Sequence, residues 1–141
     1  MDMVQFIVGD KGKGKTKHLL DKVNTEIKDV QGNIVYLDKS TKHMFELNNK
    51  IRLIYVPEYL VTDCDEFVGF VCGIISQDHD LQQMYFDSFM KIACVDADGI
   101  EKVICKLEKI SEKFHVDFVI SIALDESVLP ENVRKNIIVS L

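Results

Sequence analysis

The chain has 141 residues, of which 47% are hydrophobic and 28% are charged, and its net charge is −6. This length fits one compact domain with a substantial core, so we expect a single domain over residues 1–141. The acidic balance, with only two arginines, disfavours nucleic acid as a partner, because nucleic-acid-binding proteins usually present a basic face.

The sequence also speaks against a membrane segment. No stretch approaches the roughly 20 apolar residues that a transmembrane helix needs, and no signal peptide opens the chain. The four cysteines lack C-x-x-C spacing and lie within apolar patterns, which is typical of reduced, buried thiols. We therefore expect a cytoplasmic protein that makes no contact with a membrane.

Short apolar runs alternate with helical patterns along the whole chain. We expect strands at 4–8, 33–38, 51–56, 81–87, 116–124 and 137–141. Between them we expect a helix from about 19 that ends with Gly32 as its C-cap, a short helix at 40–49, a helix at 63–77 capped by Asp63 and Glu66, a long amphipathic helix at 100–114 and a short helix near 130–136. Several strands are apolar on both faces, which predicts a mostly parallel sheet covered on both sides. The predicted fold is a three-layer α/β/α domain.

The segment GDKGKGKT follows the first strand and matches G-x-x-x-x-G-K-[ST] at every fixed position. Glycines let the backbone curl so that its N–H groups face phosphate oxygens, and the following helix adds its N-terminal dipole. Lys15 would reach the β- and γ-phosphates, and the Thr16 hydroxyl would bind Mg²⁺. The predicted nucleotide-binding residues are Gly9, Asp10, Lys11, Gly12, Lys13, Gly14, Lys15, Thr16 and Lys17.

A phosphate-binding loop of this kind needs a second carboxylate to hold the water shell of Mg²⁺. Asp87 ends the apolar run QMYFD, and ligands of parallel sheets bind at the carboxyl edge of the strands. The simpler interpretation is that Asp87 caps the segment SFMKI that follows. We expect Thr16 and Asp87 to hold the metal, and Lys15 and Asp87 to be the catalytic residues.

With these two motifs the chain resembles the P-loop NTPases, and among them the RecA-like ATPases. The segments NIVYLDKS, IRLIYVPEYL, QMYFDS and VDFVISIALDESVLP are similar in order to core segments of that group. The outline is also similar to small stand-alone bacterial proteins labelled as twitching-motility or secretion-type ATPases. The resemblance implies a RecA-like P-loop sheet that binds Mg²⁺ and ATP and uses hydrolysis to switch a partner or its own oligomer.

The chain departs from this family where the general base belongs. RecA-like enzymes carry a glutamate two residues beyond the aspartate that ends the second strand, and this chain has Ser40 there. Many other P-loop ATPases place the glutamate directly after the second-motif aspartate, where this chain has Ser88. Asp38 and Glu126 are the remaining candidates for the base. Because a base contributes about 10²–10⁴-fold to the rate, we expect a weak ATPase.

The sequence leaves three functions open. The first is a slow ATPase, the second is a nucleotide-binding module without catalysis, and the third is a small-molecule kinase, which the scarcity of arginine disfavours. No N-K-x-D guanine signature occurs, and the choice between ATP and GTP stays open. By their position in a RecA-like fold, Lys39 and His43 are further candidates for ligand contact, whereas Ser121 is expected to face the core or a neighbouring strand.

Overall fold

The computed structural model describes residues 3–141. Its strands are β1 (Val4–Val8), β2 (Asn33–Asp38), β3 (Arg52–Tyr55), β4 (Leu81–Phe86), β5 (Asp117–Ile122) and β6 (Ile137–Ser140). Within the described residues these six strands form one sheet in the order β3-β2-β4-β5-β1-β6, and every neighbouring pair is parallel. The predicted α/β class and parallel sheet are confirmed.

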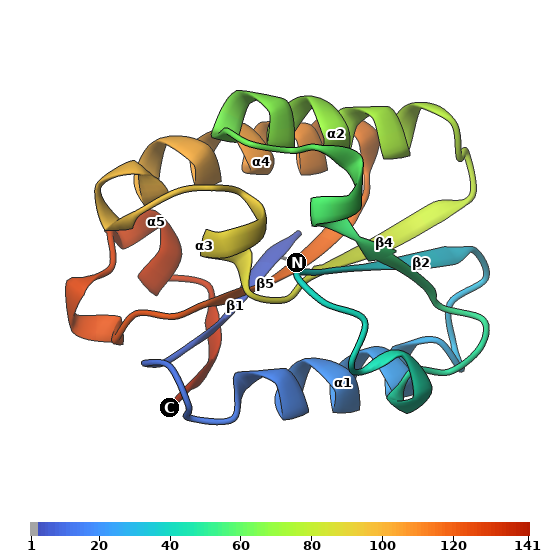
Figure 1. Cartoon of the computed structure of the whole chain (residues 1–141), viewed down its shortest axis with the longest axis horizontal. Coiled ribbons are helices and arrows are strands. Elements are labelled where there is room, and N and C mark those ends of the chain that lie inside the picture. Colours follow the sequence, from blue (N-terminus) through green and yellow to red (C-terminus); the bar gives the residue numbers. More distant parts are fainter. Residues whose placement is uncertain (1–2) are drawn as a thin grey trace.

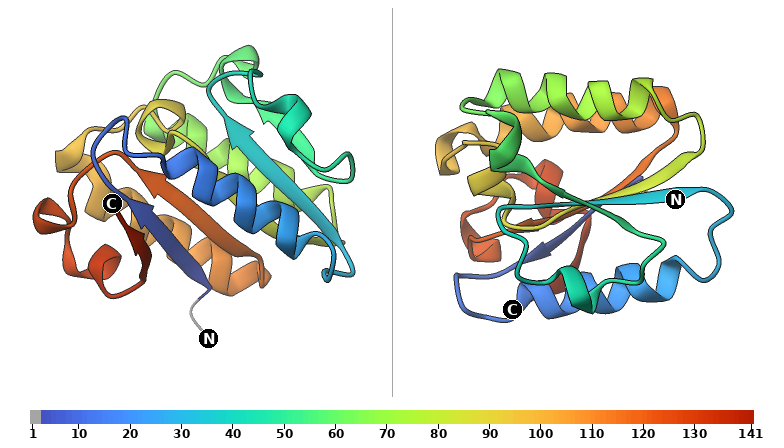
Figure 2. Two further views of the ribbon diagram at one scale, coloured as in Figure 1. Left: turned by 90° about the horizontal axis from the view of Figure 1, so that it is seen from below. Right: turned by 45° about the vertical axis from the view of Figure 1, so that its right-hand side comes forward.

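Helices cover both faces of this sheet, which gives three layers (Figure 1). They are α1 (Lys15–Glu26), α2 (Cys64–Ser76), α3 (Phe89–Ile92), α4 (Ile100–Phe114) and α5 (Glu131–Arg134). Figure 2 shows the sheet edge-on, with α2 and α4 on one side and α1 on the other. No helix within residues 3–141 combines the length and apolar character needed to cross a membrane.

The hydrophobic core is divided by the sheet into two clusters. On one side, residues of α2 and α4 such as Phe67 and Leu107 pack against the strands, and on the other side Leu19 and Val23 of α1 do so. Burial of one apolar stripe per helix explains why the 3.6-residue pattern of 100–114 predicted α4 with the correct bounds. The predicted cap of α2 is also confirmed, since the Asp63 side chain accepts a hydrogen bond from the Glu66 N–H at 2.8 Å.

The prediction that Gly32 caps the first helix is wrong. Helix α1 ends at Glu26, and Gly32 lies directly before β2, close to the backbone of the residue that precedes β4. A methyl group on Gly32 would lie 2.0 Å from the carbonyl oxygen of Asp80. The same carbonyl accepts a hydrogen bond from the Asn33 N–H at 2.7 Å. The glycine is therefore required by the close approach of two chain segments.

The predicted helix at 40–49 is also wrong, because only a single 3₁₀ turn at Met44–Glu46 forms there. The side chain of Asn24 on α1 explains the difference. It donates to the Glu46 carbonyl at 2.8 Å and accepts from the Asn48 N–H at 2.8 Å. These contacts with another element take backbone groups that a continuing helix would use.

Candidate functional site

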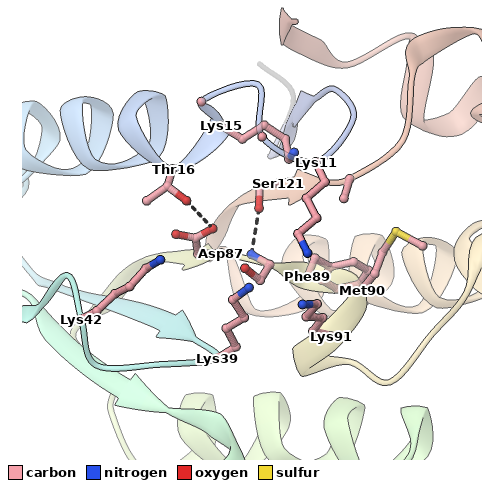
Figure 3. Close-up of a pocket in the computed structure, with 14 residues that line it drawn as sticks. Lys11, Lys15, Thr16, Lys39, Lys42, Asp87, Phe89, Met90, Lys91 and Ser121 are labelled. Carbon is pink, nitrogen blue, oxygen red and sulfur yellow. Dashed lines mark hydrogen bonds between the residues drawn. The ribbon is translucent and has the colours of Figure 1, made fainter.

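A cavity of about 290 Å³ opens at the carboxyl edge of the sheet (Figure 3). Because all strands are parallel, the loops after β1, β2, β4 and β5 meet at this edge. The cavity is lined by Lys11, Gly12, Gly14, Lys15, Thr16, Lys39, Lys42, Asp87, Ser88, Phe89, Met90, Lys91, Ser121 and Ala123. The two predicted motifs, GDKGKGKT and the aspartate after β4, therefore lie in one site.

The loop between β1 and α1 has the conformation that its glycines permit. Gly12 has φ 86° and Gly14 has φ 92°, both in the left-handed region. A side chain at either position would meet nothing within 4 Å, so the requirement for glycine is one of backbone conformation. Of the predicted nucleotide-binding residues, Gly9, Asp10, Lys13 and Lys17 do not line the cavity, and the others do.

Lys15 opens α1 and is folded back over the loop. Its Nζ donates to the carbonyl oxygen of Asp10 at 3.1 Å. Burial lowers the pKa of the Lys15 ammonium, while the charges of Asp87 and Asp10 act in the opposite direction. The Lys15 side chain therefore lines the cavity while it is held against the loop.

Asp87 is almost fully buried and connects α1 with the sheet. Its Oδ1 accepts from the Thr16 hydroxyl at 3.1 Å, and its Oδ2 accepts from the Tyr36 hydroxyl at 2.8 Å. Burial raises the pKa of the Tyr36 phenol, and the charge of Asp87 raises it further, so Tyr36 remains a donor. Tyr36 was not predicted, because nothing in the run NIVYLD shows which strand position meets the aspartate.

Thr16 and Asp87 place a hydroxyl and a carboxylate side by side at the cavity. Among residues 3–141 no three His, Cys, Asp or Glu side chains gather as a metal-binding group. Mg²⁺ does not require such a group, since it usually keeps several waters and takes one or two carboxylates together with phosphate oxygens. A hydroxyl and a carboxylate 3.1 Å apart beside a glycine-rich loop are compatible with this preference.

A second buried carboxylate lies beside Asp87. Asp38, at the end of β2, is 2% exposed. Its Oδ1 accepts from the Lys39 N–H at 2.7 Å, and its Oδ2 is buried without a hydrogen-bond partner in the described part of the chain. Burial, followed by the charge of Asp87, raises the pKa of Asp38 to about 6. The other predicted base, Glu126, does not line the cavity and accepts instead from the Ser140 hydroxyl at 2.8 Å.

Lysines dominate the lining of the cavity. Lys11, Lys15, Lys39, Lys42 and Lys91 come from the loop, from α1, from the segment after β2 and from α3. The prediction from position thus located Lys39, but His43 does not line the cavity and pairs with Glu46. Lys42 and Lys91 were missed, because a lone lysine gives no sequence signal for the direction of its side chain.

Directly after Asp87, the chain makes an unusual turn. Ser88 has φ 54°, which is uncommon for a residue other than glycine. Its N–H donates to Ser121 Oγ at 3.0 Å, and that hydroxyl donates to the Phe86 carbonyl at 3.3 Å. Ser121 thus faces the neighbouring strand, as expected. The turn starts α3 and brings Lys91 to the cavity.

Comparison with known proteins adds no family to this description. No protein-family model matches the sequence, and no curated protein matches it either. The function proposed below is accordingly based on the motifs and on the geometry of the cavity.

Proposed function

We propose that this protein binds a nucleoside triphosphate together with Mg²⁺ in the cavity at the carboxyl edge of the sheet, and hydrolyses it slowly. The observation that carries the proposal is the hydrogen bond between Thr16 Oγ1 and Asp87 Oδ1, 3.1 Å long, in a cavity lined by the glycine-rich loop. Residues 71 positions apart in the sequence thereby supply the hydroxyl and the carboxylate that a magnesium–phosphate site requires.

The residues would divide the binding between them. The backbone N–H groups of the loop would face the α- and β-phosphates, and Lys15 would reach the β- and γ-phosphates. Thr16 would bind Mg²⁺ directly, and Asp87 would hold its water shell. The metal would neutralise charge on the phosphates and orient them.

The electrostatics of the cavity support an anionic ligand. Five lysines line it, whereas Asp87 is the only acidic residue among the lining residues. This excess of positive charge occurs in a chain whose net charge is −6. A magnesium–triphosphate complex keeps a net negative charge, so it complements such a surface.

The positions of the carboxylates support slow, not fast, hydrolysis. Ser40 and Ser88 occupy the positions at which related motifs would carry a glutamate. Asp38 is the remaining nearby carboxylate, but its Oδ2 is enclosed and Asp38 does not line the cavity. A water molecule at the terminal phosphate would therefore lack a well-placed base. The same observation favours a second candidate function, a module that binds the nucleotide without turnover.

The test of this function is the thermal stability of wild type and of Lys15→Ala with Mg·ATP, Mg·GTP and Mg·ADP. Ligand at about 100 times its Kd should stabilise wild type by about 2.7 kcal/mol, and Lys15→Ala should lose this gain. Lys102→Ala, an exposed lysine on α4, is the matched control and should keep it. Phosphate release, followed in parallel, separates a slow ATPase from a module without turnover. Equal behaviour of wild type without and with nucleotide would refute the proposal.

A further inference from the structure

Three of the lysines at the cavity form a separate group. Lys11 comes from the loop, Lys39 follows β2 and Lys91 lies on α3, and their side chains point toward one another (Figure 3). Within residues 3–141 no acidic side chain forms an ion pair with any of them. Direct contact of the Lys91 and Lys39 side chains, and then the charges of Lys39 and Lys11, lower the pKa of the Lys91 ammonium group.

Like charges held together without a counter-charge repel one another, unless an anion lies between them. The structure nevertheless fixes the backbone below two of these lysines. Lys39 N–H donates to the buried Asp38 carboxylate at 2.7 Å. Lys91 belongs to α3, whose Phe89 is fully buried, with ring centroids 5.9 Å from Phe67 and 6.1 Å from Phe86. The backbone at Lys39 and Lys91 is therefore held in place, as a binding site requires.

We propose that Lys11, Lys39 and Lys91 bind the terminal phosphate of the nucleotide and make the site selective for triphosphates over diphosphates. This inference rests on the proposed function, and it names the ligand class of the same site. Lys15 and Thr16 lie on the side of α1, whereas Lys39 and Lys91 lie across the cavity from it (Figure 3).

The direction of the ligand explains the selectivity. A nucleotide whose first two phosphates contact the loop N–H groups would extend its third phosphate across the cavity, toward Lys39 and Lys91. A diphosphate would end at the loop and leave the three lysines unpaired. Each charge-assisted contact made only by the third phosphate would strengthen the binding of the triphosphate alone.

The experiment is calorimetric titration of Mg·ATP and Mg·ADP into wild type, Lys39→Ala, Lys91→Ala, the double variant, Lys15→Ala and the control Lys102→Ala. The double variant should bind Mg·ATP at least about tenfold more weakly, with the affinity for Mg·ADP changed less than about twofold. Lys15→Ala should weaken the binding of both ligands, and Lys102→Ala should weaken the binding of neither. Lys39→Arg, which keeps the charge, should retain most of the preference for Mg·ATP.

The outcomes separate this inference from the proposed function. If the double variant lost affinity for Mg·ATP and Mg·ADP equally, or lost affinity for neither, the subsite would be refuted while the proposed function would stand. Absence of nucleotide binding by wild type would refute the function and the subsite together. The melting temperature of the ligand-free protein is a second, independent readout. Because Lys91→Ala removes repulsion between the lysines, it should leave this melting temperature unchanged or raise it. A clearly lower melting temperature would indicate that Lys91 has a structural role, and would count against the subsite.

Discussion

Asp38→Asn is expected to raise the free energy of unfolding by up to about 3 kcal/mol at about pH 7.5. The Asp38 carboxyl has a pKa of about 6 in the folded protein, against an ordinary value of 3.8, because of burial first and the neighbouring charge of Asp87 second. A pKa difference of this size corresponds to about 3 kcal/mol. Asparagine removes the buried charge, and its carbonyl oxygen can still accept from the Lys39 N–H; its amide group takes the place of the unpaired Oδ2, so about 3 kcal/mol is the upper limit of the gain.

The sign of the pH dependence follows from the same pKa values. Above pH 6 the carboxyl is ionised in both states, and only the folded state is destabilised by the charge. Below pH 3.8 it is protonated in both states, and the destabilisation disappears. Urea unfolding should therefore show the advantage of Asp38→Asn shrinking toward zero as the pH falls to about 4. The raised pKa of Asp38 would be contradicted if Asp38→Asn were less stable than wild type at neutral pH, or if its gain in stability did not change with pH.

Asp98→Asn is the matched control for this experiment. Asp98 is exposed before α4, and its replacement changes the net charge by the same amount. The free energy of unfolding of this variant should stay within about 0.5 kcal/mol of wild type. Phosphate release by Asp38→Asn should stay close to the wild-type rate, because Asp38 does not line the cavity and its Oδ2 is enclosed.

Gly32→Ala is expected to lower the free energy of unfolding by about 3 kcal/mol or more. The added methyl group would lie 2.0 Å from the carbonyl oxygen of Asp80, which is backbone and cannot rotate away. Relief of the overlap would separate Gly32 from that carbonyl and weaken the 2.7 Å bond from the Asn33 N–H at the start of β2. Overpacking typically costs about 1–3 kcal/mol, and contact with a backbone carbonyl that cannot move away puts this variant at the upper end or beyond it. Urea unfolding at neutral pH measures it.

The control for Gly32→Ala is the same substitution on an exposed helix. Gly69 lies in α2, and a methyl group there would meet nothing within 4 Å. Alanine restricts the unfolded chain and suits a helix, so Gly69→Ala should stabilise the protein by about 0.5–1 kcal/mol. The free energy of unfolding should therefore fall in Gly32→Ala and rise in Gly69→Ala. A neutral Gly32→Ala would show that the two segments are not in close contact.

The elements that were predicted correctly can each be recognised from a short segment of the sequence. The apolar runs of β4 and β5 are buried on both faces of the sheet, so composition alone marks them as strands. The loop at 9–16 is marked by the spacing of its glycines, and Gly12 and Gly14 take the left-handed conformation that glycine permits. The pairing of Thr16 with Asp87 could be expected once the parallel sheet was predicted.

The features that were missed depend on contacts between distant segments. Gly32 was interpreted as a helix cap, whereas its contact is with Asp80, far along the chain. The helix predicted at 40–49 does not form because Asn24 of α1 takes its backbone groups. Lys91 reaches the cavity through the turn at Ser88, which is held by Ser121 on another strand. None of these contacts leaves a periodic pattern in the sequence.

The most direct test of nucleotide binding in this cavity is equilibrium dialysis of the whole protein against labelled ATP, with Mg²⁺ and with a chelator. Wild type should retain one nucleotide per chain with Mg²⁺ and far less with the chelator, because in the proposed site Thr16 and Asp87 would bind the nucleotide through the metal. Asp87→Asn should lose the dependence on Mg²⁺, and Lys15→Ala should lose retention in both buffers. No retention by folded wild type in the presence of Mg²⁺ would contradict the assignment of this cavity as a nucleotide site.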